Sequence, residues 1–254
     1  MSEDLQRALQ ALQDESQPLT RRILSQFSGL PRADSDAFMV ALANLSDDRR
    51  RRTVALMLEY AEESFELDFV ALFRRLLSNS DATVRRMAVE GLWEDESRSL
   101  VEPLVALLLR DQDPAVRAAA ATSVGRFVYM AECEELDARR RDLVRRALEQ
   151  VISAPDEQIE VRRRAVESIA YVNDDVVRRI IDRAYSDSDP QMRESAVFAM
   201  GRSADLIWAD TVLAELQSKT PAMRYEAARA CGELQLKRAV PGLVKMADAE
   251  DAEL

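Results

Sequence analysis

Two stretches of fifteen residues in this chain carry the same residue types at the same positions. They read DQDPAVRAAAATSVG over residues 111–125 and DSDPQMRESAVFAMG over residues 187–201. Three further segments place an arginine in an equivalent setting, and we call the five residues the anchor arginines: Arg85, Arg117, Arg162, Arg193 and Arg224. Successive anchors lie 32, 45, 31 and 31 residues apart. Such a period predicts a stack of small helical units, because one unit alone cannot bury its own apolar face.

Each period contains two segments with the apolar spacing of a helix. Around each anchor arginine, apolar or small residues recur one position before it and three, four and seven positions after it. This spacing places them on one side of an α-helix and differs from the alternation of a strand. The second apolar segments lie between the anchors, over residues 100–110, 142–153, 175–185, 206–217 and 239–248. We therefore expect one pair of helices in each period.

Local signals mark the ends of the anchor helices. Asp113, Asp189 and Thr220 are each followed by a proline, so we expect their side chains to accept hydrogen bonds from the first backbone N–H groups. The third position after an anchor is always small, which predicts close helix packing there: Ala120, Ala165, Ala196 and Ala227. Glycines follow at the eighth position, which we expect near the helix end: Gly125, Gly201 and Gly232.

The motif D-x-x-V-R-x-x-A-x-x-x-[LM]-G, present as DPAVRAAAATSVG and DPQMRESAVFAMG, resembles the HEAT-like repeats, in particular the short variety named after phycobilisome lyases. The resemblance implies an all-α fold, a right-handed α-α superhelix (solenoid) of antiparallel helix pairs. It covers residues 66–254, with an expanded repeat around residues 126–156. Residues 1–65 fit it loosely, and we expect N-terminal helices there that form degenerate or capping repeats.

The last residues of the chain read as the start of another anchor segment. Residues 251–254 align with Asp113–Val116, so the C-terminal repeat is predicted to be incomplete. The last helix would then expose an apolar face that includes Val240, Leu243 and Val244. We expect either a fragment of a longer repeat protein or a partner contact through this helix; a short natural end with a frayed helix is the alternative. The sequence leaves the oligomeric state open.

Composition excludes several classes of function. The chain has 254 residues without a histidine, so the commonest metal ligand and neutral-pH base are absent, and we predict no catalytic site, metal or cofactor. Its six glycines form no phosphate-binding loop, and its two cysteines fit neither a zinc cluster nor a disulfide framework. No segment has the length of a membrane span and no secretion signal is present, so we expect a cytoplasmic protein.

A cation in the first turn of a helix faces the positive end of the helix dipole. We expect the five anchor arginines to offset this by forming an internal ladder with carboxylates of the same or the adjacent repeat, from the set Asp81, Asp113, Glu157 and Asp189. For Arg86, Arg163 and the arginines at 49–52, solvated surface is favoured over a site that awaits an external anion.

Positions one, five and nine after each anchor are predicted to point away from the apolar side. In HEAT-like solenoids these second helices line the concave surface, so we expect these positions to bind a partner. The candidates for partner binding are Arg86, Glu90, Arg126, Arg163, Tyr171, Phe198, Arg202, Tyr225 and Arg229. Arginines and glutamates balance along this stripe and aromatic residues lie between them, which is typical of protein-docking surfaces.

Five aromatic and apolar positions outside the stripe are also candidates for a defined role. Phe127, Tyr129 and Met130 lie in the expanded repeat and form a second candidate for recognition. Trp93 and Trp208 are predicted to fill the space between repeats, because large aromatic side chains are usually mostly buried.

These observations favour a non-catalytic scaffold that binds a protein or peptide. The alternative is a nucleic-acid-binding protein or an enzyme that resembles HEAT-like DNA glycosylases. That alternative requires a basic groove, which the formal net charge of −11 and the balanced stripe argue against. A bilin-lyase partner is suggested only by the name of the repeat variety. HEAT-like deoxyhypusine hydroxylases use His-Glu metal motifs, which a chain without histidine does not contain.

Overall fold

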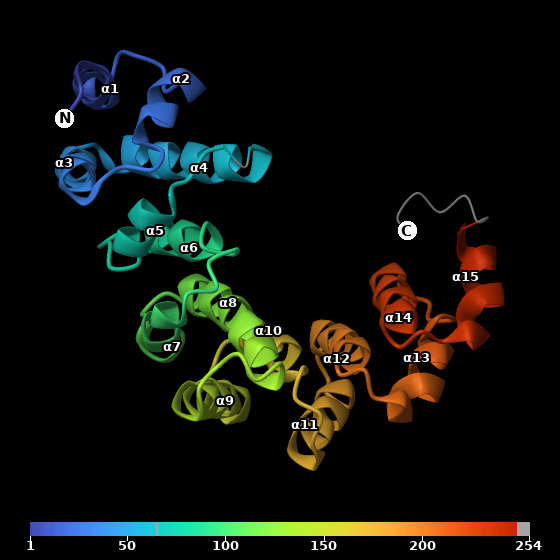
Figure 1. The fold of residues 1–254 in the computed structure, drawn as a ribbon. Helices are drawn as coiled ribbons and strands as arrows, with labels where there is room; N and C mark the ends of the chain where they lie inside the picture. The colour runs from blue at the N-terminus through green and yellow to red at the C-terminus, as the bar shows by residue number, and fades with distance from the viewer. Residues whose placement is uncertain (65, 248–254) are drawn as a thin grey trace. The chain divides into compact units, whose positions relative to one another are not determined.

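The computed structural model describes residues 1–64 and 66–247, and every regular element in these ranges is helical (Figure 1). The packing of the chain divides it into unit 1, Met1–Ser97, and unit 2, Arg98–Leu254. The sequence pattern places the end of the N-terminal part at residue 65, so unit 1 takes in the first anchor helix as well. No described helix combines the length and the apolar character that a membrane span requires.

Unit 1 is built from short helices that pack in pairs. Helix α1 packs on α3, α4 packs on α2 and α6, and α5 packs on α3 and α6. The elements are α1 Glu3–Gln13, α2 Arg21–Leu24, η1 Ser25–Phe27, α3 Arg32–Ala43, α4 Asp47–Glu63, α5 Val70–Leu76 and α6 Ala82–Glu90. The aromatic core includes Phe27 and Phe38, whose ring centroids lie 4.7 Å apart.

Two arginines in the first turn of α4 donate hydrogen bonds to backbone carbonyls at the C-terminal ends of α1 and α3. Arg49 is 9% exposed and donates from Nε to the Leu12 carbonyl at 2.6 Å and from Nη2 to the Ala11 carbonyl at 2.9 Å. Its neighbour Arg50 donates in the same way to the carbonyls of Leu42 and Leu45, after the last turn of α3. The prediction of solvated surface is therefore wrong for Arg49. The cations that conflict with the dipole of α4 neutralise the negative ends of α1 and α3.

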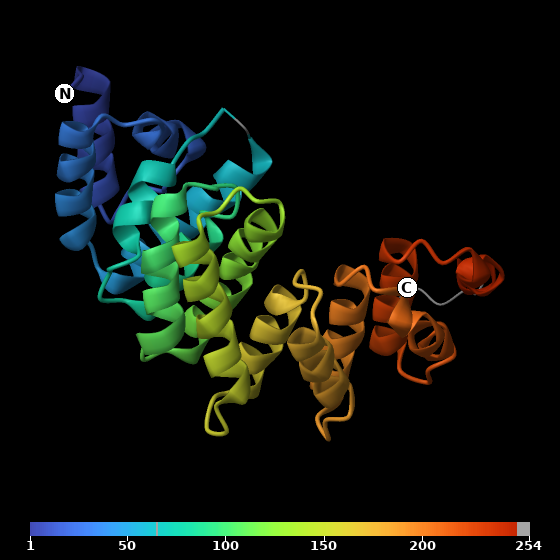
Figure 2. The ribbon, with the colours of Figure 1, turned by 60° about the horizontal axis from the view of Figure 1, so that its bottom comes forward.

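Unit 2 stacks antiparallel helix pairs in two layers (Figures 1 and 2). The second helices α8, α10, α12 and α14 pack side by side, and each first helix packs on the second helix that follows it. The elements are η2 Arg98–Leu100, α7 Val101–Arg110, α8 Pro114–Glu132, α9 Ala138–Ser153, α10 Ile159–Ile169, α11 Asp175–Tyr185, α12 Pro190–Arg202, η3 Leu206–Trp208, α13 Ala209–Glu215, α14 Pro221–Glu233, η4 Lys237–Ala239 and α15 Val240–Ala247. The fold is an α solenoid, as the sequence predicts.

The predicted helix starts are largely confirmed. Asp113 accepts hydrogen bonds from the backbone of Ala115 and Val116, and Asp189 accepts one from Met192 at 3.0 Å. Thr220 is the exception, because its hydroxyl makes no capping hydrogen bond. The proline at the first position fixes the start of α14 without it.

Small residues allow the second helices to approach one another closely. The four alanines at the third position after the anchors are each 0% exposed. A methyl group added to Gly201 would lie 2.6 Å from Cα of Ala230, and one added to Gly125 would lie 3.3 Å from Cα of Ser168. Gly201 and Gly232 lie near helix ends, as predicted, whereas Gly125 lies in the middle of α8. The glycine slot therefore serves helix packing at Gly125 and Gly201, where a side chain would not fit.

The expanded repeat is longer because its two helices are longer. Helix α8 has 19 residues and α9 has 16, whereas α10 and α11 have 11 residues each. The turn between α8 and α9 includes Glu134 in the left-handed conformation, with φ of 61°. The additional residues of the expanded repeat thus lie mainly in longer helices.

Helix α15 contains no buried residue, and Val240 and Val244 are each 54% exposed. The predicted alignment of residues 251–254 with an anchor segment lies outside the described residues.

Candidate functional site

The nine residues predicted for partner binding fall in both units. Arg86 and Glu90 lie on α6 of unit 1, where Nη1 of Arg86 and Oε1 of Glu90 form an ion pair at 2.5 Å. The other seven lie on or directly after the second helices of unit 2. We call this surface of unit 2 the second-helix face.

An arginine sandwiched by two aromatic rings lies at the centre of the second-helix face. The guanidinium carbon of Arg202 lies 4.2 Å from the ring centroid of Phe198 and 4.8 Å from that of Tyr171. Arg229 stacks on Phe198 as well, at 4.0 Å, and the ring of Tyr129 lies 5.2 Å from that of Tyr171. Cation–π contacts of this kind hold an arginine in one orientation. The row extends from α8 to α14 and is therefore supplied by four successive repeats.

Arg202 has no hydrogen bond or ion pair with any described residue. Burial lowers the pKa of its guanidinium from the ordinary value. None of its side-chain nitrogen atoms is both buried and without a hydrogen-bond partner. Because Arg202 forms no hydrogen bond with a described residue, these nitrogen atoms reach solvent. Arg202 is thus a partly buried cation. Its guanidinium group is held between two rings, and its N–H donors are accessible to solvent. A carboxylate brought by a binding partner would fit these donors.

A buried polar network lies beside this row. Arg163 is only 9% exposed, and its Nε donates a hydrogen bond to Oγ of Ser195 at 3.0 Å. Ser195 in turn donates to Oε1 of Glu167 at 2.6 Å, and Glu167 pairs with Arg164. The prediction that Arg163 lies on the exposed stripe is therefore wrong. It joins α10 to α12 inside the helix layer.

Sequence reasoning missed Arg164, Ser195 and Glu226 as members of this region. All three occupy the second position after an anchor arginine, in three successive repeats. Polar residues at this second position in neighbouring repeats could have indicated these three members. The predicted stripe uses positions one, five and nine and therefore leaves the second position out. The slot lies at the margin of the face, where the helices meet.

Glu226 carries an unfavourable charge on this face. Burial raises the pKa of its carboxyl group, and the carboxylates of Glu167, Glu194 and Glu233 act in the same direction against the cation of Arg229. Its Oε2 is buried without a hydrogen-bond partner in the described chain, and the nearest cationic nitrogen, on Arg229, is 4.0 Å away. The ionised form of Glu226 therefore costs stability in the free protein.

We expect Glu226→Gln to stabilise the protein at neutral pH by less than about 1 kcal/mol, because this carboxyl group is only partly buried. Since the folded-state pKa of this carboxyl group lies above its ordinary value, the native state binds the proton before the unfolded chain does as the pH falls. The gain of the variant over the wild type should therefore shrink as the pH falls through the raised pKa. Thermal unfolding of both proteins between neutral and acidic pH measures this difference. Glu62→Gln, at an exposed position of α4, is the control and should show no such gain.

The anchor arginines bind the turn that precedes their own helix. Nη1 of Arg117 donates to the carbonyls of Asp111 and Gln112, and Arg193 does the same to Asp187 and Ser188. Arg85 and Arg224 repeat this geometry. The carboxylate partners include Glu157 of the next repeat, which forms a two-bond pair with Arg117 at 3.0 and 2.7 Å.

The acids expected for the ladder have several partners. Asp81 pairs with Arg51 at 2.7 Å and caps α6, while Asp113 and Asp189 cap α8 and α12. Arg162 lies 3.8 Å from Asp187 in the adjacent repeat. Backbone carbonyls are therefore major hydrogen-bond partners of the anchor arginines. The sequence pattern does not reveal this role.

The second candidate for recognition, in the expanded repeat, contains both buried and exposed side chains, and so does the pair of tryptophans. In α8, Phe127 and Met130 are buried, and Tyr129 is 53% exposed. Arg126 donates to Ser123 and stacks on Phe127 at 4.8 Å. Trp208 is buried, as predicted. Trp93 is 60% exposed, so the prediction that it fills space between repeats is wrong.

The described residues contain no group of three or more histidine, cysteine, aspartate or glutamate side chains that could hold a metal ion. Both cysteines are free; Cys133 is exposed and Cys231 is buried. Burial raises the pKa of the Cys231 thiol, which is therefore held in its protonated form.

A model of HEAT repeats matches residues 69–153 and 177–254, which together make up more than half of the chain. The chain belongs to the HEAT repeat family. Comparison with curated proteins gives no match for this HEAT repeat protein.

Solved structures similar to this HEAT repeat protein include a chain from the complex of CpcE and CpcF of phycocyanin lyase from Nostoc sp. PCC7120. It is 14% identical with a TM-score of 0.47, over 66% of this chain and 99% of that chain. Human deoxyhypusine hydroxylase is 16% identical with a TM-score of 0.39, over 99% of this chain and 92% of that chain. A designed armadillo repeat protein is 16% identical with a TM-score of 0.41, over 91% and 99%. At these identities and TM-scores, the likenesses have no bearing on function.

Proposed function

We propose that this HEAT repeat protein is a non-catalytic scaffold that binds a protein partner on the second-helix face of unit 2, the surface expected to be concave. The observation that carries the proposal is Arg202, a cation fixed between two rings with open N–H donors and no carboxylate of its own. Oriented arginine and aromatic side chains are the residues that contribute most to protein–protein binding. Tyr225, which is 54% exposed one turn before Arg229, extends the same surface.

The charge of the face supports a protein partner over a nucleic acid. The carboxylates of Glu167, Glu194 and Glu233 lie close enough to Glu226 to help raise the pKa of its carboxyl group, after the larger effect of burial. A phosphate backbone would meet these carboxylates as well as the arginines, and binding of nucleic acid depends on neutralising phosphates with cations. A protein surface can present carboxylates to Arg202 and cations or N–H donors to the glutamates.

Contacts within the protein hold several side chains of the second-helix face in place before a partner binds. Arg163, Ser195 and Glu167 lock α10 to α12, and Arg229 is held between Phe198 and the carboxylate of Glu233 at 3.1 Å. Side chains that are already ordered lose little further entropy when a partner binds. This supports a docking surface that keeps one shape.

The test is an affinity capture from native lysate, quantified by mass spectrometry, with wild-type protein and an Arg202→Met/Tyr225→Ala variant. Methionine keeps much of the packing between the rings and removes the charge and the donors. We expect partners of the wild type to be depleted by about tenfold in the variant, which corresponds to the loss of one strong contact.

The matched control is Leu206→Ala/Ile207→Ala, which truncates two side chains of unit 2 that are each 64% exposed and lie outside the second-helix face. This control should capture the wild-type partners in full. Equal recovery by wild type and Arg202→Met/Tyr225→Ala would refute the proposal. A mobility shift of duplex or single-stranded DNA at physiological salt would favour the nucleic-acid alternative instead.

A further inference from the structure

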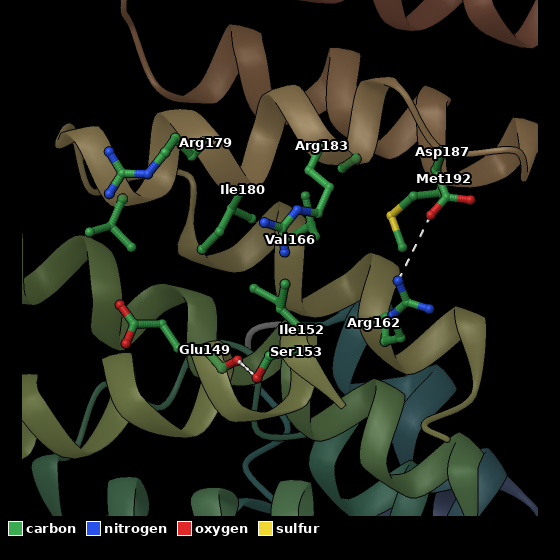
Figure 3. A pocket seen from close by; sticks show the side chains of 12 residues that line it. Glu149, Ile152, Ser153, Arg162, Val166, Arg179, Ile180, Arg183, Asp187 and Met192 are labelled. Carbon is green, nitrogen blue, oxygen red and sulfur yellow. Dashed lines mark hydrogen bonds and ion pairs between the residues drawn. The ribbon is translucent and has the colours of Figure 1, made fainter. Parts of the chain in front are cut away.

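A second surface of unit 2 contains a cavity of about 340 Å³ between the first helices α9 and α11 (Figure 3). Ile152 from α9 and Ile180 from α11 point into it, and Val166 and Met192 of the second helices also line it. The apolar part of its lining thus comes from two successive helix pairs, α9 with α10 and α11 with α12. Arg162, Arg179 and Arg183 complete it.

The cavity lies where the repeat changes its length. Helix α9 belongs to the expanded repeat and has 16 residues, whereas α11 has 11. The main packing of α9 is against α7, α8 and α10, and that of α11 is against α10 and α12. The two helices therefore rest on the second-helix layer, with the cavity between them. The cavity thus lies next to the 45-residue interval in an otherwise 31- to 32-residue period.

Arg162 differs from the other anchor arginines at this cavity. The other four donate to two carbonyls of the preceding turn, as described above. For Arg162 the described contact is the pair with Asp187, at 3.8 Å, and its Nε is buried without a hydrogen-bond partner in the described chain. A buried donor of this kind costs free energy until an acceptor reaches it. Nε of Arg162 therefore remains an unsatisfied buried donor beside the cavity, although Asp187 lies near the Nη2 atom of the same side chain.

The charged side chains of the lining that have no ion-pair partner among the described residues are both arginines. Arg179 and Arg183 are exposed, lie one turn apart on α11, and form no ion pair or hydrogen bond with any described side chain. The two acids of the lining are already engaged: Glu149 pairs with Arg145 at 2.8 Å, and Asp187 accepts from the backbone of Asp189 at 2.9 Å and pairs with Arg162. Two exposed arginines without a carboxylate partner among the described residues therefore border the apolar part of the cavity, and the unsatisfied Nε of Arg162 lies buried beside it.

We propose that this cavity binds an acidic peptide segment of a partner protein. One apolar side chain of the segment fills the space between Ile152 and Ile180, and flanking aspartate or glutamate carboxylates pair with the exposed guanidinium groups of Arg179 and Arg183. A phosphate backbone would satisfy the cations and leave the apolar lining exposed, so an acidic peptide fits better than a nucleic acid. The site is formed by the first helices and is separate from the second-helix face proposed above.

The experiment selects short peptides from a random displayed library on the immobilised full chain. The selected peptides are then measured by fluorescence anisotropy against wild type and an Arg179→Glu/Arg183→Glu variant. We expect selected sequences to place an apolar residue between acidic residues, and to bind the charge-reversed variant at least about tenfold more weakly. Ile180→Ala should weaken the same peptides by about three- to tenfold, because it removes apolar contact area.

Arg139→Glu/Arg146→Glu is the matched control, since it reverses two exposed arginines of α9 that do not line the cavity. It should bind the selected peptides as the wild type does, and so should Arg202→Met/Tyr225→Ala. The inference is overturned if the selection enriches no acidic–apolar sequence, or if the enriched peptides bind Arg179→Glu/Arg183→Glu as tightly as wild type. Peptides that lose affinity only for Arg202→Met/Tyr225→Ala would also overturn it, and would support the second-helix face instead.

Discussion

Arg49→Met is expected to lower the free energy of unfolding by about 3 kcal/mol, because it removes one buried and two part-buried charge-assisted hydrogen bonds to backbone carbonyls. The guanidinium bonds to the carbonyls of Ala11, Leu12 and Gln17 at distances of 2.6 to 3.0 Å. Methionine restores the apolar volume but no donor. Urea unfolding followed by far-ultraviolet circular dichroism measures the loss.

Arg52→Met is the matched control for this prediction. It lies one turn further along α4, is exposed, and has no hydrogen bond or ion pair with a described side chain. The two substitutions remove the same charge from the same helix, so a general effect of charge would change both proteins equally. If Arg52→Met were as destabilising as Arg49→Met, the role of Arg49 in closing the end of α1 would be wrong.

Gly201→Ala is expected to lower the free energy of unfolding by about 2–3 kcal/mol, because a methyl group on α12 would collide with the backbone of α14. The added carbon would lie 2.6 Å from Cα and 2.8 Å from Cβ of Ala230, and neither atom can move without moving the helix. Thermal and urea unfolding measure the loss. Separation of α12 from α14 would also disturb the stacking of Arg229 on Phe198.

Gly232→Ala provides the comparison for Gly201→Ala. Gly232 is the last but one residue of α14, as Gly201 is of α12, and a methyl group there meets nothing within 4 Å. Alanine is a better helix former than glycine, so this variant should be as stable as the wild type or more stable by up to about 1 kcal/mol. A loss of stability from Gly232→Ala equal to that from Gly201→Ala would show that close packing is not the reason for the glycine at position 201.

The repeat pattern predicts the helices well because it reflects packing within one repeated unit. Apolar spacing around Arg117 and Arg193, with Asp113 and Asp189 as caps, depends on contacts a few residues apart. The same contacts recur in each repeat, so the helix pairs and the buried alanine slot follow from the period alone. Thr220 shows the limit, since proline at the first position makes the side-chain cap dispensable.

The candidate site was predicted less completely, because exposure depends on the neighbouring helix. Arg163 and Arg202 occupy the first and ninth positions after their anchors, and both were expected on the outer stripe. Arg163 faces Ser195 of α12 and is buried, whereas Arg202 remains accessible between two rings. Which of these two arginines meets a neighbour depends on how α10 and α12 approach each other.

The sequence by itself determined an all-helical repeat fold, the positions of its helix pairs and the site of the expanded repeat, because those properties rest on spacing and local hydrogen bonding. Only the tertiary structure decided that Arg49 closes another helix, that Gly201 but not Gly232 is required to be small, and that a cavity opens between α9 and α11. Each of these depends on the distance between segments that are far apart in the chain. That distance is set by side-chain packing across the stack, which a repeat pattern does not specify.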